Sequence, residues 1–272
     1  GLASSAGSVL VSSTVGRHGS AAQVGEYLMQ DGFRFGPSRV QRDRVIGRAR
    51  ITRLLNGRFT HRVTTIVGAA GYGKSTALAL AVENNHLDPL GRDVWISAMP
   101  ADGDPVHLLS GIGTALGVVP TGDDDTIARI VDAVWSAAPD EVCIIIDDAH
   151  HLADTPSCVR LQQLLEAMPT NAHLVLASRR PVDLHVARMR AHGTLLEITE
   201  ADLSLDDDEI RTLVQRDGSH ISDPTHLPRH VATAHLQLAA GIDAGADFLW
   251  EEILSALEPD RRPCRLSECR SG

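Results

Sequence analysis

The only lysine of this chain lies in a sequence pattern that is specific for one kind of chemistry. The sequence contains 25 Lys and Arg residues, and all but Lys74 are Arg. Lys74 belongs to an octapeptide of the pattern G-x-x-x-x-G-K-[ST], formed by Gly68, Ala69, Ala70, Gly71, Tyr72, Gly73, Lys74 and Ser75. In this pattern backbone N–H groups converge on phosphates, the lysine reaches the β- and γ-phosphates as a compact charge, and the hydroxyl ligates Mg²⁺. A forked guanidinium has the wrong shape for that place. The octapeptide therefore predicts a phosphate-binding loop.

The segments around the octapeptide favour this interpretation over a chance glycine turn. Residues 61–67 are rich in β-branched side chains and predict a buried strand. Residues 76–82 are apolar helix formers and predict a buried helix. A strand, a glycine loop and a helix in this order point a helix N-terminus at an anion. Because Lys74 is the only lysine, no Asn-Lys-x-Asp guanine-reading sequence can exist, so ATP with Mg²⁺ is the expected ligand.

Two carboxylates form the second part of the expected site. Asp147 and Asp148 follow directly after an apolar strand predicted over 142–146. A carboxylate at the end of a strand beside the loop can hold Mg²⁺, so we assign Asp147 and Ser75 to the metal. Asp148 would orient or deprotonate the attacking water as a catalytic residue, together with Lys74. Two aspartates after a strand also occur as a turn and helix cap, and that alternative stays open.

Arg179 is a further catalytic candidate, as a sensor of the γ-phosphate. It follows a strand predicted over 173–178 and would reach that phosphate if this strand lay between the other two. The alternative is a solvated basic turn, and we favour the sensor role for Arg179 over Arg180. His150 and His151 follow the acidic pair, but a phosphate site of this kind uses oxygen ligands. We interpret them as packing or helix-start residues.

Strand and helix patterns alternate along the middle of the chain. Further strands and amphipathic helices are predicted over 94–97, 105–116, 127–135, 159–165 and 195–198. Such alternation is typical of a parallel sheet covered by helices on both faces. Beyond Ser204 only helical patterns remain, beginning with Asp206 as an N-cap and Glu209 three residues later. We expect an α/β fold of the P-loop NTPase class, followed by a small helical lid.

These patterns divide the chain into four expected parts. They are a loosely ordered lead-in (1–36) with a short helix near 24–29, a P-loop NTPase α/β domain (37–200), a helical lid (201–259) with helices near 229–240 and 246–257, and a disordered tail (260–272). The tail lacks apolar periodicity and cannot bury enough surface to order itself.

Composition narrows the classes of function. The net charge of −10 argues against a broad nucleic-acid-binding surface, although it leaves a local patch open. No apolar run approaches the roughly 18 residues of a membrane span. The four cysteines match no zinc spacing and suggest no disulfide framework, and Cys143 lies in an apolar strand as an expected core residue. We therefore expect a cytoplasmic protein that binds nucleotide and makes no direct contact with nucleic acid or membrane.

Three segments resemble a known class of proteins. They are similar to the signal-transduction ATPases with numerous domains (STAND), an AAA+-like class. The three segments are the glycine loop extended to Thr76, residues 147–152, and residues 176–179. Within it the chain resembles the large ATP-binding LuxR-type transcriptional regulators, the group of the maltose-regulon activator, over about residues 40–258. The resemblance implies that Thr76 also binds nucleotide and that Arg48 belongs to a segment packed near adenine.

The resemblance also implies a function. It indicates an ATP-dependent switch in which nucleotide state controls opening and self-association, and slow hydrolysis resets the switch. Members of the group carry a winged helix, sensor repeats and a DNA-binding helix-turn-helix, none of which is recognisable after residue 262. We expect the switch domain of a bacterial regulator without its sensor and DNA-binding parts. The alternative is a non-hydrolysing or degenerate nucleotide-binding or interaction module, and ATP turnover separates the two.

Overall fold

A computed structural model describes residues 34–37, 45–119, 125–217, 227–231 and 234. The chain divides into two units, 1–32 and 33–272, and every described residue belongs to the second. The helix expected near 24–29, the helix expected near 246–257, most of the one near 229–240 and the tail over 260–272 lie outside the described residues.

Five parallel strands form the sheet of the described chain. They are β1 (Val63–Val67), β2 (Arg92–Ser97), β3 (Val142–Asp147), β4 (Ala172–Ser178) and β5 (Leu195–Ile198), in the order β2-β3-β4-β1-β5. Every residue of β3 and β4 is buried, as the unbroken apolar runs in these segments require. The five strand predictions are confirmed, with small shifts of their ends. Because the strands are parallel, their carboxyl ends all lie at one edge of the sheet.

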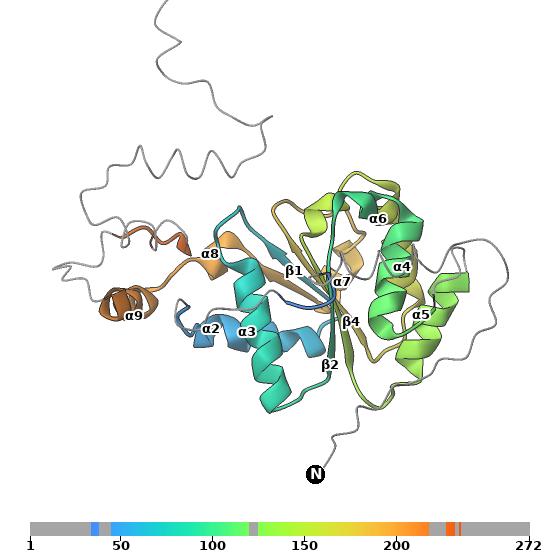
Figure 1. Ribbon diagram of the computed structural model, residues 1–272, viewed down its shortest axis with the longest axis horizontal. Helices are drawn as coiled ribbons and strands as arrows, with labels where there is room; N and C mark the ends of the chain where they lie inside the picture. The colour runs from blue at the N-terminus through green and yellow to red at the C-terminus, as the bar shows by residue number, and fades with distance from the viewer. Residues whose placement is uncertain (1–33, 38–44, 120–124, 218–226, 232–233, 235–272) are drawn as a thin grey trace, which may run out of the picture. The chain divides into compact units, whose positions relative to one another are not determined.

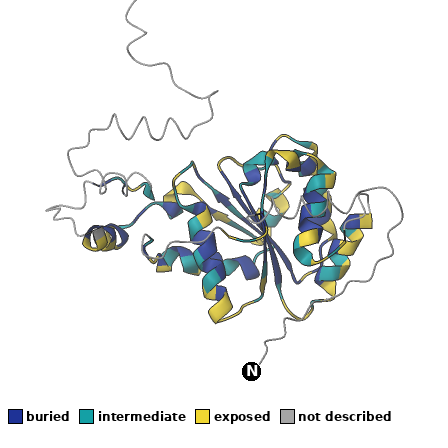
Figure 2. Ribbon diagram, in the orientation of Figure 1, coloured by how far each residue is buried: buried dark blue, intermediate teal, exposed yellow. Residues whose placement is uncertain are grey.

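Helices cover both faces of this sheet, as expected. One face is covered by α2 (Ala49–Asn56) and α3 (Lys74–Leu87), and the other by α4 (Pro105–Leu116), α5 (Asp125–Trp135) and α6 (Pro156–Ala167) (Figure 1). In β3, Ile144 and Ile146 pack on the α4–α6 face, while Cys143 and Ile145 pack on the α2–α3 face. The alternation follows from the period of two along a strand, and it confirms Cys143 as a core residue. Figure 2 shows the strands buried and the outer faces of the helices exposed.

Several short elements connect these layers. They are the 3₁₀ helices η2 (Gly57–Phe59), η3 (Pro100–Gly103) and η4 (Ala149–His151) and the helices α7 (Ala187–Ala191) and α8 (Glu200–Leu203). Their apolar patterns are too short for periodicity to reveal them, so the sequence did not predict them. Among the described helices, none has the length and apolar character needed to cross a bilayer.

The helical region after β5 begins as its sequence predicts. Helix α9 (Asp207–Asp217) starts with a reciprocal pair of contacts. The Glu209 N–H donates to Asp206 Oδ1 at 2.8 Å, and the Asp206 N–H donates to Glu209 Oε2 at 3.2 Å. This region has a small core separate from those of the sheet, formed by Ile46, Leu205, Ile210, Leu213, Val214, Leu227 and Ala234.

Candidate functional site

The octapeptide forms a turn between the carboxyl end of β1 and the start of α3. Gly71 and Gly73 have φ values of 85° and 77°, a left-handed conformation that glycine adopts without steric cost. Gly73 is also the N-cap of α3, so the loop leads directly into the N-terminus of a 14-residue helix. The unpaired N–H groups of such a terminus attract an anion. The loop therefore has the shape that a bound phosphate requires.

Lys74 is folded back over this loop. Its Nζ donates to Gly68 O at 2.6 Å and to Ala69 O at 2.9 Å. An ammonium has three donors, so these two bonds orient the group and leave one donor for a ligand. Burial lowers the pKa of Lys74, and the neighbouring Asp147 opposes that effect. The lysine is thus held near the loop by backbone carbonyls instead of a tight ion pair.

Ser75 and Asp147 come close together beside the loop. The Ser75 side chain lies near the carboxylate of Asp147, which is 5% exposed at the end of β3. Burial raises the pKa of Asp147, and the nearby Ser75 hydroxyl opposes the rise. Both groups offer hard oxygen donors of the kind that Mg²⁺ prefers. No cluster of three His, Cys, Asp or Glu within the described part of the chain could hold a metal ion. These two residues therefore fit Mg²⁺ that takes its other ligands from phosphate and water.

Asp148 has an unusual backbone and an accessible side chain. Its φ is 52°, in the left-handed region that few residues other than glycine adopt, although Asp tolerates it. The conformation turns the chain sharply into η4 and leaves the carboxylate half exposed, 3.7 Å from His150 Nδ1. His150 and His151 lie in η4 with their ring centroids 4.2 Å apart. Asp148 is thus placed at the carboxyl edge of the sheet, where it can meet a water molecule.

Arg179 follows directly after β4, the strand between the two that precede the loop and Asp148. Strand β4 is hydrogen-bonded to β1 on one side and to β3 on the other. Arg179 is exposed, and its charge lowers the pKa of Lys74. Arg180 instead donates to Asp154 Oδ2 at 2.6 Å, which is a surface ion pair. The charge of Arg179 thus acts on the loop lysine, and its role as a sensor of the γ-phosphate stays a prediction.

Arg48 is buried against the helical region after β5. Its Nη2 donates to Leu203 O at 2.8 Å, to Ser204 O at 3.1 Å and to Glu209 Oε2 at 3.0 Å. Arg48 Nε and Nη1 and Glu209 Oε1 are buried, and none of the three has a hydrogen-bond partner among the described residues. The side chain therefore joins α2 to α8 and α9. Its place in a nucleotide site stays a prediction.

Two residues outside the predicted set bond the loop, and a third lies beside it. Glu200, the first residue of α8, accepts a hydrogen bond from the Ala69 N–H at 2.7 Å. The Nε2–H of His230 donates to Ala70 O at 2.8 Å. Val231 lies 3.8 Å from the place that a Cβ on Gly73 would take. No local pattern marks these residues, because the sheet register and the return of the chain after α9 bring them to the loop.

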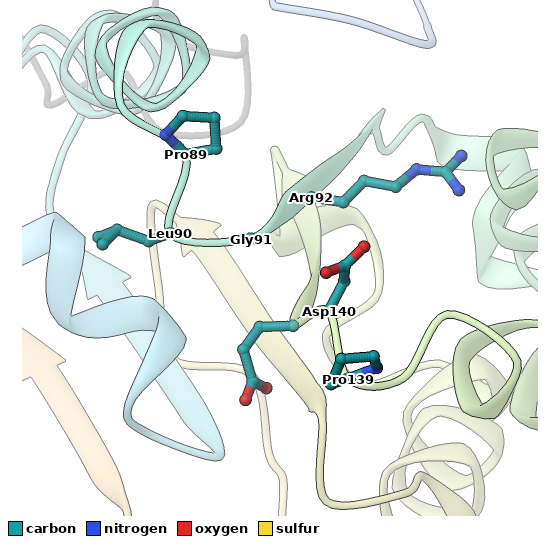
Figure 3. Close-up of a pocket in the computed structure, with 7 residues that line it drawn as sticks. Pro89, Leu90, Gly91, Arg92, Pro139 and Asp140 are labelled. Carbon is teal, nitrogen blue, oxygen red and sulfur yellow. The ribbon is translucent and has the colours of Figure 1, made fainter.

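A separate pocket lies at the opposite edge of the sheet. It has a volume of about 350 Å³ and is lined by residues 89–92 and 139–141, next to the first residues of β2 and β3 (Figure 3). The loop follows the carboxyl end of β1, at the other edge of the same parallel sheet, so this pocket is not part of the phosphate site.

Comparisons with known proteins agree with this geometry. Residues 57–183 match the family described as "AAA domain". Serine/threonine-protein kinase PknK of Mycobacterium tuberculosis is 28% identical over 266 residues, which cover 80% of this chain and 23% of that protein. HTH-type transcriptional regulator MalT of Vibrio cholerae is 28% identical over 259 residues, which cover 80% of this chain and 28% of that protein. The chain spans about a quarter of the length of these relatives.

Solved structures show a weaker likeness. AMPPCP-bound DnaA from Aquifex aeolicus has a TM-score of 0.44 at 15% identity, over 76% of this chain and 63% of that one. A Walker-type ATPase of Pyrococcus abyssi has a TM-score of 0.48 at 12% identity, over 85% of this chain and 79% of that one.

Proposed function

We propose that this chain, which carries an AAA-type P-loop domain related to MalT-type regulators and to PknK, binds ATP with Mg²⁺ and hydrolyses it slowly as the switch domain of a bacterial regulator. The observation that carries the proposal is the meeting of two groups from distant segments. Lys74 is held over the glycine loop, and the Ser75 side chain lies near the buried Asp147 carboxylate. A chance glycine turn would not bring a hydroxyl and a buried carboxylate from a distant strand to the same place.

Each group has a distinct task in this proposal. The loop N–H groups and Lys74 hold the phosphates, with Thr76 and Arg48 as further nucleotide contacts. Ser75 and Asp147 hold Mg²⁺, which neutralises charge on the phosphate oxygens when it is bound. Asp148 orients the attacking water and accepts its proton, and Arg179 stabilises charge on the γ-phosphate. The contacts from Glu200 and His230 would transmit the state of the loop to the helical region.

Calorimetric titration of the chain with Mg-ATP tests the binding. Lys74→Ala removes the positive charge at the β- and γ-phosphates and should weaken binding about a hundredfold, since a charge-assisted hydrogen bond and the attraction of the ammonium for the phosphate charges are both lost. Lys74→Arg should also fail, because a planar guanidinium does not fit the loop. Arg129→Ala is the matched control, since it removes one positive charge from an exposed pair with Asp125 on α5. Unchanged affinity in Lys74→Ala would refute the proposal.

A non-hydrolysing nucleotide-binding module is the second candidate. It would share the loop, Lys74 and the pair of Ser75 and Asp147, so binding alone does not separate it from a slow ATPase. Measuring phosphate release from Mg-ATP under single-turnover conditions separates the two candidates. Release that depends on the chain favours the switch, and binding without release favours the second candidate.

A further inference from the structure

We infer that Glu200 is a positioning residue, which sets the place of the Lys74 ammonium through the peptide group between Gly68 and Ala69. The inference rests on the proposed role of Lys74 in binding a triphosphate. Glu200 itself would touch neither nucleotide nor metal.

A short chain of hydrogen bonds carries the inference. The Lys74 Nζ donates to Gly68 O at 2.6 Å, and the N–H of the same peptide group, that of Ala69, donates to Glu200 Oε1 at 2.7 Å. A peptide group bonded at both ends cannot rotate without breaking one of the two bonds. A charged acceptor at the N–H also polarises the carbonyl and strengthens the bond that this oxygen accepts. The carboxylate therefore fixes and strengthens the contact that orients the lysine.

The sheet register explains why this carboxylate reaches the loop. Ile66 of β1 is paired with Ile198 of β5, so Gly68 and Glu200, each two residues further on, come to lie opposite each other. The start of α8 is fixed by a capping box in which the Thr199 N–H donates to Asp202 Oδ2 at 2.9 Å. A Cβ on Gly68 would lie only 3.0 Å from Glu200 Cγ, so glycine at this position leaves room for the Glu200 side chain to approach the loop closely.

Two further side chains lie at the same stretch of loop. Burial raises the pKa of the Tyr72 hydroxyl, and the nearby Glu200 carboxylate raises it further. The Tyr72 ring meets the ring of His230 edge to face, with centroids 4.5 Å apart, while His230 bonds Ala70 O. Glu200 and His230 thus hold the peptide groups 68–69 and 70–71 from two different segments. Of these two side chains, only Glu200 bonds a peptide group whose carbonyl accepts from the lysine.

The chain offers a direct test, because Lys74 is its only lysine. Labelling lysine with ¹³C and ¹⁵N gives one side-chain signal, whose order parameter reports the mobility of this ammonium without nucleotide. We expect Glu200→Ala to lower that order parameter and to weaken Mg-ATP binding by about tenfold or more, the loss of one hydrogen bond to a charged group. Glu200→Gln keeps an acceptor oxygen and should lie between wild type and Glu200→Ala in both measurements.

Glu197→Ala is the matched control, because it removes an exposed carboxylate of β5 that pairs with Arg190. It should change neither the lysine signal nor the affinity. An unchanged Lys74 order parameter in both Glu200 variants would overturn the inference even if the wild type binds Mg-ATP. Failure of the wild type to bind Mg-ATP would overturn the proposed function, while the lysine signal would still show whether Glu200 positions Lys74. A loss of affinity in Glu200→Ala with an unchanged lysine signal would mean that Glu200 acts by another route.

Discussion

At the scale of single residues, the loop is the part of the site that the sequence predicts best. Its glycines, Lys74 and Ser75 are contiguous, so their types and spacing alone specify a shared ligand. Asp147 and Arg179 were predicted from a weaker signal, their place after an apolar strand, and the strand order then brought them to the loop. Glu200 has no such signal. Its role exists only because β5 pairs with β1 in one register.

Asp148 is the residue whose role a single substitution can isolate. We expect Asp148→Asn to bind Mg-ATP as the wild type does and to lose turnover, because the amide keeps the shape of the carboxylate and loses its basicity. Asparagine also tolerates the left-handed backbone at this position, where φ is 52°, so the fold should be retained. Single-turnover phosphate release measures the effect. Equal rates in the two proteins would show that Asp148 is a turn residue only.

At the scale of secondary-structure elements, the sequence predicted the long strands and helices and missed the short ones. A run such as 172–178 is buried throughout and reads as a strand from its residues alone. Helices α7 and α8 have five and four residues, fewer than two turns, so no periodicity can develop.

Buried charges between elements were also missed. Arg34 pairs with Asp102, whose side chain is fully buried and also accepts from His107 Nδ1 at 2.7 Å.

A second buried ion pair, Arg58 with Asp93, allows the contribution of a contact between two elements to the free energy of unfolding to be measured away from the site. Arg58, in η2, donates to both carboxylate oxygens of Asp93 in β2, at 2.9 and 2.8 Å, and both side chains are nearly inaccessible. Arg58→Ala would leave the carboxylate buried without its charge partner. We expect a loss of about 3–5 kcal/mol in the free energy of unfolding, measured by urea denaturation.

Arg190→Ala is the control for this prediction. Arg190 makes the same two-bond contact with Glu197, at 2.8 and 2.7 Å, but both side chains are largely exposed. Because exposed ion pairs contribute little, its unfolding midpoint should stay close to that of the wild type. A similar loss in both variants would mean that burial is not the cause.

At the scale of the whole described chain, the phosphate loop lies between separate cores. The sheet has one core on each face, and the region of α9 has its own. Val231, which packs against this third core, lies beside Gly73 of the loop, and Glu200 and His230 bond the loop backbone at Ala69 and Ala70. A ligand on the loop is therefore linked to the stability of a region that does not belong to the sheet. The sequence predicted a helical region after the sheet but no contact between it and the loop.

This linkage predicts that Mg-ATP protects α9 from proteolysis. Arg211 is exposed on α9, and trypsin can cleave after it only when the helix opens locally. If that opening separates Glu200 and His230 from the loop, a ligand at 100 times its dissociation constant should suppress it about a hundredfold. We expect cleavage after Arg211 to slow accordingly in the wild type and to stay unchanged in Lys74→Ala. Cleavage after Arg129, exposed on α5, is the internal control and should not respond as strongly. A wild type that binds Mg-ATP but is cut after Arg211 at an unchanged rate would show that the helical region opens independently of the loop.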